Sequence, residues 1–252
     1  MGIVEETQVM ENETFLPTTT IKGSKVTNVS EEHLGMLEEM MIDPDNGKIA
    51  YAVLSFGGFL GIGNKLFAIP WEVLESSRGD YILRIEKSVL EKMEGFDKEE
   101  WSLTRDELAK VYAHFEIQPY WETKMGIVEE TQDMDNEIFL STTTIKGSQV
   151  INVKKEHLGK IEELMIDVGM GRIAYEVLSF GGFLGIGNKL FAIPWEALES
   201  DGWDYILKID KSVLEKAEGF DKEEWSLTRH KLAKVYAHFK IQPYWKSKKY
   251  IS

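Results

Sequence analysis

The stretch SFGGFLGIGNKLFAIPWE, residues 55–72, decides the fold of this chain, and it occurs a second time without change as residues 179–196. A run rich in β-branched and aromatic residues, 48–56, leads into its four glycines, and residues 64–69 read as a short strand that Pro70 ends. Two strands joined by glycines predict a β-hairpin, because glycine tolerates positive φ and close approach of another backbone. The tip of this hairpin is unusually apolar.

The hairpin belongs to a tandem repeat of the whole sequence. Residues 1–124 (copy 1) align with residues 125–248 without a gap, and 96 of the 124 aligned positions are identical. Copy 1 has 12 Lys and Arg against 23 Asp and Glu, net −11, whereas copy 2 has 17 against 20, net −3. We predict two domains, at residues 1–124 and 125–252. We also expect Met36 to point outward, because its equivalent is Lys160 and lysine is rarely buried.

Further strands flank the hairpin within each copy. In copy 1, residues 18–28 predict two short strands around a turn, and residues 81–85 predict a last strand. Residues 33–43 fit a strand with a bulge near the glutamate pair at 38–39, which reconciles its apolar positions. A helix is the alternative for this segment, but Gly35 and the turn that follows weaken it.

Helical segments complete each copy. Proline is favoured in the first turn of a helix, so a helical turn is predicted after Pro70, and residues 88–93 predict a short helix that Gly95 ends. Residues 104–115 carry apolar side chains at helical spacing and predict an amphipathic helix, whose apolar stripe must cover part of the β structure. The aromatic residues at 120–121 are expected to be exposed.

The turn between the two longest predicted strands resembles the start of a calcium loop. An EF-hand, however, needs a ligand where Gly47 stands and a glutamate where Leu54 stands. Copy 2 reads Asp-Val-Gly-Met-Gly here and loses the amide and the second acid while it keeps the last glycine, Gly171. A turn that requires positive φ at Gly47 and Gly171 fits both copies. We therefore predict no metal site.

The glycine-rich tip does not match a phosphate-binding loop. A Walker A loop ends in Gly-Lys-Ser/Thr, and a dinucleotide fingerprint leads into a helix, whereas Gly63 is followed by Asn64 and a strand. Two interpretations stay open: the tip packs on its own barrel, or it forms an apolar contact with another chain or copy. On the second interpretation, the candidate interaction surface consists of Phe59, Leu60, Ile62, Phe183, Leu184 and Ile186.

No group of residues in the sequence predicts catalysis. The five histidines have no partner at metal-binding spacing and are expected to be solvated at the surface. Adjacent acids such as those at 38–39 point to opposite faces of a strand, and general acid–base catalysis needs two convergent groups. We predict no catalytic, cofactor-binding or metal-binding residue, no cofactor, and no enzymatic activity.

The charge of the chain restricts its partners. A net charge of −14 repels the phosphates of nucleic acids and anionic membranes, whereas a basic protein partner is compatible with it. There is no cysteine, which excludes disulfides and suits the cytoplasm. No apolar run reaches the roughly 20 residues of a membrane span, and the acidic amino terminus does not read as a signal peptide. We expect a cytoplasmic protein.

The pattern Asp-x-x-x-Gly-x-Ile-Ala-Tyr-x-Val-Leu-x-Phe-Gly-Gly-Phe-Leu-Gly-Ile-Gly-x-Lys-x-x-Ala-Ile-Pro-Trp resembles the PRC-barrel domain, which is named after the cytoplasmic domain of the photosynthetic reaction centre H subunit. The resemblance implies a mainly β fold with C-terminal helices in each copy. It places barrel cores at about 18–93 and 142–217, with helical tails at 96–121 and 220–245.

The resemblance also bears on function, because this family reuses its barrel as a binding module. It implies a non-catalytic adaptor that binds a protein partner or regulates an assembly. The alternative is a small-ligand carrier or an enzyme with a site between the copies, and a role on RNA or in ribosome maturation is the third reading. We further expect the two copies to pack together as a covalent pseudo-dimer, or the chain to form a homo-oligomer.

Overall fold

The structure is a computed structural model, and it describes residues 15–57, 65–93, 95–96, 102–122, 139–181, 189–202, 204–217, 219–220 and 226–246. These residues form two compact units. The copy-1 unit is Thr20–Thr142, and the copy-2 unit joins Thr143–Ser252 to Met1–Thr19. The first residues of each copy therefore belong to the unit of the other copy.

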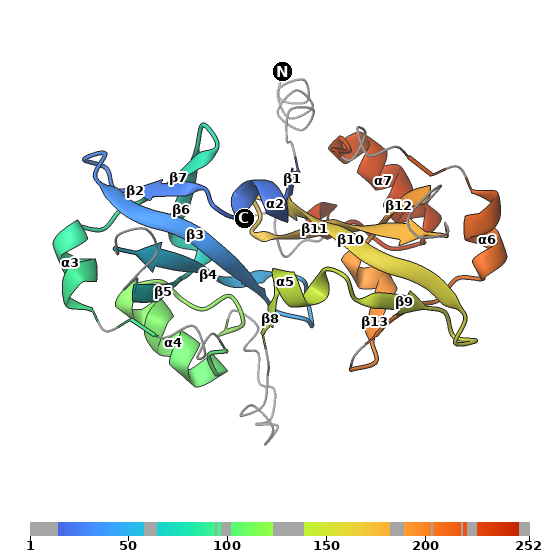
Figure 1. Cartoon of the computed structure of the whole chain (residues 1–252), viewed down its shortest axis with the longest axis horizontal. Helices are drawn as coiled ribbons and strands as arrows, with labels where there is room; N and C mark the ends of the chain where they lie inside the picture. The colour runs from blue at the N-terminus through green and yellow to red at the C-terminus, as the bar shows by residue number, and fades with distance from the viewer. Residues whose placement is uncertain are drawn as a thin grey trace. The chain divides into compact units, whose positions relative to one another are not determined.

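The copy-1 unit is built on one curled sheet of seven strands (Figure 1). Six of them run in the order β5-β4-β3-β2-β7-β6, and the seventh, β8, pairs with β3. Neighbours are antiparallel except β2 and β7, which are parallel. The strands are β2 (Lys25–Thr27), β3 (His33–Ile42), β4 (Ile49–Phe56), β5 (Lys65–Ile69), β6 (Leu74–Ser77), β7 (Asp80–Leu83) and β8 (Leu140–Ser141).

The copy-2 unit repeats this sheet with the order β12-β11-β10-β9-β14-β13, and β1 pairs with β10. The parallel pair is β14 with β9. The strands are β1 (Leu16–Pro17), β9 (Gln149–Ile151), β10 (His157–Asp167), β11 (Arg172–Phe180), β12 (Lys189–Ile193), β13 (Leu198–Ser200) and β14 (Tyr205–Leu207).

The central strands are buried along their whole length. All eight residues of β4 and all nine of β11 are buried, as expected for apolar strands covered on both faces. The long strand β3 has the predicted bulge, because its pairing with β4 shifts between Leu37 and Glu39. Met36 is 49% exposed, which confirms its outward position.

Helices cover one face of each sheet. The predicted amphipathic helix of copy 1 is α4 (Arg105–His114), and Thr104 begins it with a capping box to Glu107. Its Leu108 and Tyr112 are fully buried, and the Tyr112 hydroxyl donates to the carbonyl oxygen of Ala50 at 3.0 Å. The equivalent in copy 2 is α7 (Arg229–His238). The remaining helices are α2 (Thr18–Ile21), α3 (Lys87–Lys92), α5 (Thr142–Ile145), α6 (Lys211–Lys216) and the 3-10 turns η1 (Trp71–Val73), η5 (Trp195–Ala197) and η7 (Tyr244–Lys246).

Two local predictions are wrong, and one strand was missed. The first half of segment 18–28 forms the helical turn α2 and not a strand, and β6 was not predicted at all. The aromatic pair that ends each copy is not exposed, since Tyr244 is 4% and Trp245 8% exposed and the copy-1 pair is half-buried. These rings pack against the covering helix, where the Trp245 ring centroid lies 5.2 Å from that of Tyr236.

Other local predictions are confirmed. The helical turn after Pro70 is η1, and Gly47 and Gly171 have φ of 69° and 58°. All five histidines are exposed. The mainly β fold with helices in each copy is confirmed as well. The repeat boundary after residue 124 stays a prediction, because compact units and sequence copies do not coincide.

The bulged strand allows a stability test at Gly159, whose φ is 156°. A Cβ there would lie 2.0 Å from the carbonyl oxygen of Ser179, so Gly159→Ala should lower the free energy of unfolding by about 2 kcal/mol or more. Gly169→Ala is the control, because its Cβ would meet nothing closer than 3.7 Å. Urea denaturation measures both variants, and equal stability of the two would contradict the close-approach account.

Candidate interaction site at the exchanged strands

Each unit is completed by a short strand from the other copy. In the copy-2 unit, β1 pairs with β10 through Leu16 opposite Ile166 and Pro17 opposite Met165. In the copy-1 unit, β8 pairs with the equivalent positions of β3. The boundary between the units falls inside α2 on the one side and inside α5 on the other.

The long strands have room for this pairing because their inner partner is short. One side of β10 pairs with β11 from Gly159 to Asp167, whereas β9 covers the other side only from His157 to Lys160. Residues further along, Met165 and Ile166, are fully buried. Buried backbone groups need hydrogen-bonding partners, and β1 supplies them.

A phenylalanine anchors each exchanged segment. Phe15 is 1% exposed, and its ring lies edge-on to that of Tyr175 with 5.8 Å between centroids. It belongs to the cluster that includes Tyr236 of α7. Phe139 packs in the same way on Tyr51, at 5.9 Å. Complete burial of such a side chain stabilises by about 1.5–3 kcal/mol.

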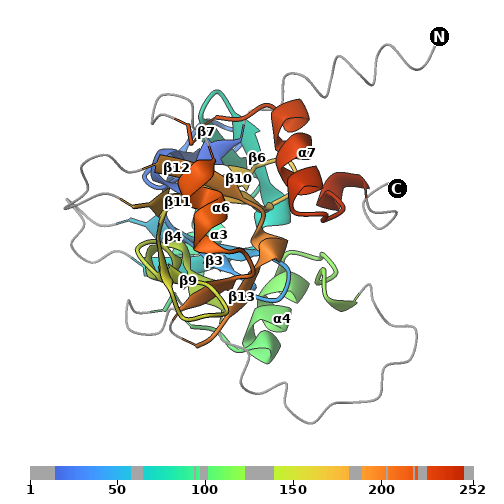
Figure 2. The ribbon, with the colours of Figure 1, turned by 90° about the vertical axis from the view of Figure 1, so that its right-hand side faces the viewer.

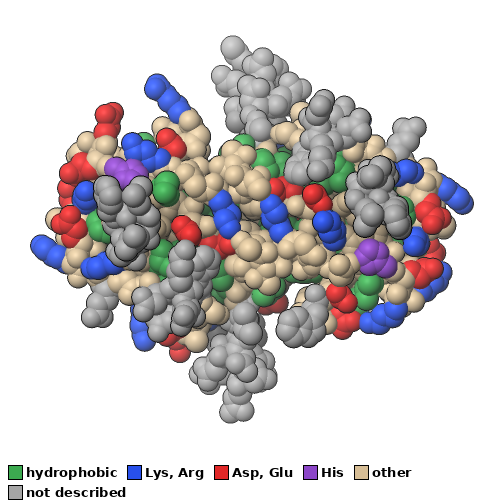
Figure 3. Space-filling view, in the orientation of Figure 1, with side chains coloured by type: hydrophobic (Ala, Val, Ile, Leu, Met, Phe, Trp, Pro, Cys, Tyr) green, Lys and Arg blue, Asp and Glu red, His purple; other side chains and the backbone are tan. Residues whose placement is uncertain are grey.

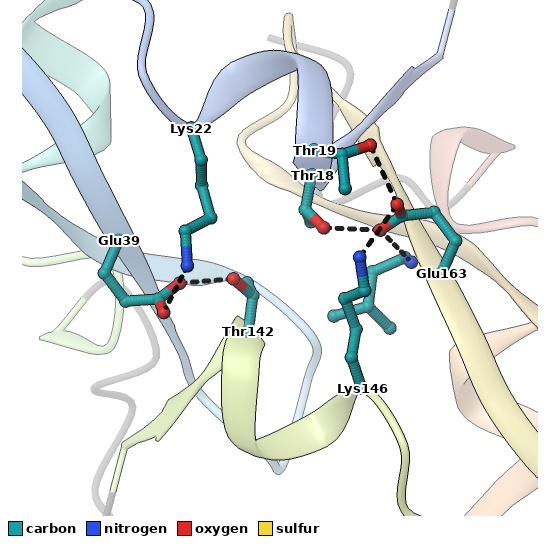
Figure 4. Close-up of polar contacts among 8 residues, drawn as sticks. Thr18, Thr19, Lys22, Glu39, Thr142, Lys146 and Glu163 are labelled. Atoms are coloured by element: carbon teal, nitrogen blue, oxygen red, sulfur yellow. Dashed lines mark hydrogen bonds and ion pairs between the residues drawn. The ribbon is translucent and has the colours of Figure 1, made fainter.

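A buried glutamate lies beside each exchanged segment (Figure 4). Glu163 of β10 is 2% exposed. Thr18 and Thr19, from the other copy, donate their hydroxyls to its carboxylate at 2.5 and 2.9 Å. Lys146 donates at 2.9 Å, and the backbone N–H of Leu164 at 3.0 Å. Four donors thus surround one carboxylate.

Glu39 of β3 has the same environment in the copy-1 unit (Figure 4). It is 1% exposed, and its carboxylate accepts hydrogen bonds from the Thr142 hydroxyl of the exchanged segment and from the N–H of Met40 at 2.9 Å. Lys22 pairs with it at 2.8 Å. Each unit therefore combines a carboxylate and a lysine of one copy with a threonine of the other.

Hydrogen bonds decide the ionisation of Glu163. Burial by itself raises the pKa of this carboxyl, but the bonds from Thr18, Lys146 and the Leu164 N–H outweigh it and lower the pKa below the ordinary 4.5. The carboxylate is therefore ionised in the folded protein at neutral pH. An ionised, fully bonded carboxylate fixes the position of the threonine that reaches it.

A second buried glutamate distinguishes the copies. Glu176 of β11 replaces Ala52 and is fully buried, and neither of its carboxylate oxygens has a hydrogen-bond partner among the described residues. Burial, and the nearby charge of Glu196, raise its pKa well above 4.5, although Arg172 opposes this. Its folded-state pKa is raised, so its destabilising contribution grows as pH rises above 4.5. The pH dependence of stability that Glu176 contributes is therefore opposite in sign to that of Glu163.

The candidate interaction surface predicted from the sequence is the apolar hairpin tip of each copy. Phe59, Leu60, Ile62, Phe183, Leu184 and Ile186 lie outside the described residues. On the face in Figure 3, acidic and basic side chains are interspersed, and the large apolar side chains that are exposed among the described residues are single valines and Met36. No cluster of three His, Asp or Glu side chains suited to a metal occurs in the part of the chain that the structure describes.

Sequence reasoning missed the exchanged site. One signal was present: Phe15, Leu16 and Thr18 are unchanged in copy 2, while Thr14 and Pro17 beside them are replaced. The pairing partner could not be read from this, because β3 and β10 offer the same edge residues to either segment.

Comparison with known families identifies the class of this protein. The model of the PRC-barrel domain matches twice, at residues 13–90 and 137–214, and the chain belongs to this family as a tandem PRC-barrel protein. Both matches include the exchanged segment at their start. A search of curated proteins gave no match. Among the described residues, no helix is long and apolar enough to span a membrane.

The exchange predicts that a substitution in copy 1 weakens the barrel of copy 2. Phe15→Ala should destabilise the copy-2 unit by about 3 kcal/mol and speed amide hydrogen exchange in β10 and β11. Phe139→Ala is the reciprocal control and should act on β3 and β4. Mass spectrometry can separate the two, because residues 160–176 and 36–52 differ in sequence. Faster amide hydrogen exchange in the barrel of the substituted copy itself would contradict the strand exchange between the copies.

The buried carboxylate predicts acid sensitivity. A lowered folded-state pKa means that the contribution of Glu163 is complete above pH 4.5 and is lost as pH falls through the folded value. Glu163→Gln should cost about 2 kcal/mol at pH 7 and less at pH 3.5. Glu162→Gln, its half-buried neighbour, should change stability little at either pH. A loss for Glu163→Gln that does not depend on pH would contradict the role of the charge.

Proposed function

We propose that this protein is a non-catalytic interaction module whose barrels recognise a short extended segment of the form Phe-Leu-x-Thr. The observation that carries the proposal is the pairing of β1 with β10 and of β8 with β3. Addition of a strand to an exposed sheet edge is a common mode of peptide recognition. The tandem chain fills both edges with its own segments.

Affinity and specificity have separate sources at this site. Backbone pairing at Leu16 and Pro17 supplies hydrogen bonds that any extended peptide could make. The pocket beside Tyr175 selects a phenylalanine, and Glu163 selects a hydroxyl three residues later. A bonded buried carboxylate strongly disfavours a segment that lacks the hydroxyl, because one of its donors is then lost.

The polar groups of the site support a binding role over a catalytic one. Glu39 and Glu163 are buried, and each accepts hydrogen bonds from a lysine, a threonine and a backbone N–H. A general base must be within hydrogen-bond reach of a substrate proton, whereas these carboxylates already accept hydrogen bonds from the protein itself. The partner we propose is therefore a protein segment, with basic character in its flanks because the chain carries −14.

Covalent linkage of the copies explains how the sites stay filled. A tethered segment is present at an effective concentration near millimolar. A free segment of the same affinity must therefore reach a concentration above this value to displace it. A partner with a better Phe-Leu-x-Thr segment would displace the internal one. A second molecule of this chain carries the same segment and is itself a candidate partner.

A peptide competition experiment tests the proposal. The peptide ETFLPTTTIK, residues 13–22, should bind the full-length Phe15→Ser variant saturably. It should bind the unsubstituted chain at least about tenfold more weakly, because the internal segment occupies the site there. Fluorescence anisotropy of a labelled peptide measures both.

Two controls make the result interpretable. A peptide with serine in place of phenylalanine should not bind, and the full-length Val29→Ser variant, altered at an exposed position, should behave like the unsubstituted chain. Thr18→Val removes only the hydroxyl donor and serves as a milder variant should Phe15→Ser unfold. Equal binding of both peptides, or equal binding to substituted and unsubstituted chains, would contradict the proposal.

A further inference from the structure

The copy-2 unit contains a cavity between its outermost strand and two helices. It has a volume of about 330 Å³ and lies between β12, α6 and α7, whose positions are seen in Figure 2. This volume is at the lower end of the range for small-molecule sites. The walls are apolar, and they include Phe191, Leu214, Ala217 and Phe220. Among the described lining residues, the basic side chains are all on α7.

Two differences between the copies meet at this cavity. Ala217 in its wall replaces Met93 of copy 1, which removes a long side chain from the wall. Lys231 on α7 replaces Glu107, which reverses the charge at that position. The first change enlarges the cavity and the second makes its border cationic. Neither is needed for the fold, because copy 1 folds in the same way without them.

The change to lysine also removes a stabilising contact. In copy 1 the Glu107 carboxylate accepts hydrogen bonds from the N–H and the hydroxyl of Thr104, at 2.8 and 3.0 Å. In copy 2, Thr228 still accepts from the N–H of Lys231, but a lysine cannot return the bond. Loss of half of a capping box weakens a helix start. The lysine therefore weakens the start of α7.

The basic side chains at the cavity lie on one face of α7. Lys231, Lys234 and His238 follow the i, i+3, i+7 spacing of a single helix face, and all three are exposed. Among the described residues, neither lysine amino group forms an ion pair. Two ammonium groups beside an apolar cavity complement an anion with an apolar body.

We propose that this cavity binds a small amphipathic carboxylate, an aliphatic acid whose chain enters between Phe191 and Ala217. Its carboxylate would lie at the border, within reach of Lys231 and Lys234. Burial of each methylene favours the bound state, and a lysine ammonium pairs with a carboxylate as a flexible point charge. The two residues of copy 2 that favour this ligand, Ala217 and Lys231, are Met93 and Glu107 in copy 1.

Calorimetric titration of the full-length protein with decanoate, kept below its micelle concentration, tests the proposal. The unsubstituted chain should bind one equivalent. Ala217→Met, which restores the copy-1 residue and fills the cavity, should weaken binding about tenfold or more. Lys231→Glu, which restores the copy-1 charge, should do the same. Decanol, which lacks the carboxylate, should bind about tenfold more weakly than decanoate.

A matched control separates the site from the general charge of the helix. Lys240→Glu also restores a copy-1 charge, but it lies beyond α7 and outside the cavity, so it should leave decanoate binding unchanged. Absence of saturable binding, equal binding by Ala217→Met, or an equal loss in Lys240→Glu would each overturn the proposal. The peptide experiment on Phe15→Ser reports on the other site and is independent of this result.

Discussion

The structure depends on one constraint in each unit: the second half of the long strand, β3 or β10, needs a pairing partner along one edge. β3 and β10 are longer than the strands β2 and β9 beside them, and their last residues are buried, so the backbone groups there require a partner. The exchanged segments provide it. Each segment brings three features at fixed spacing: an aromatic anchor, a two-residue strand and a threonine that meets a buried carboxylate. These three features hold each segment on the strand of the other copy.

The two copies keep the side chains that meet at the exchanged site. The glutamate, the lysine, the phenylalanine and the threonine of the exchanged site are the same in both. The differences are spread along the chain and include the turn after the long strand, Glu176 and two residues at the cavity of copy 2, together with the shift in charge from −11 to −3. Copy 2 thus retains the assembly chemistry of copy 1 and presents a different outer surface and a different interior.

The sequence predicted the elements and missed their exchange. The hairpin, the bulge in β3, the glycine turns and α4 follow from local patterns, because turn residues and apolar spacing act within a few positions. Segment 18–28 failed because its threonines read as a strand, whereas Thr18 and Thr19 turn toward a glutamate 145 and 144 positions away. Tyr244 was misplaced for the same reason: its partner, Asp167, lies far away in the sequence. Two nearly identical copies also offer the same partners, and no local pattern distinguishes them.

Disulfide trapping tests the strand exchange most directly, because the chain contains no cysteine. Leu16→Cys is combined with Ile166→Cys, its partner across copies, or with Ile42→Cys, the equivalent residue of its own copy. A protease site is inserted after residue 124, and the monomeric chain is oxidised, cleaved and run on a non-reducing gel. The account predicts that Leu16→Cys with Ile166→Cys stays one covalent species, whereas Leu16→Cys with Ile42→Cys keeps two free thiols. If Leu16→Cys with Ile166→Cys instead fell into two fragments, and Leu16→Cys with Ile42→Cys lost its free thiols, each copy would keep its own first strand, and the account would be contradicted.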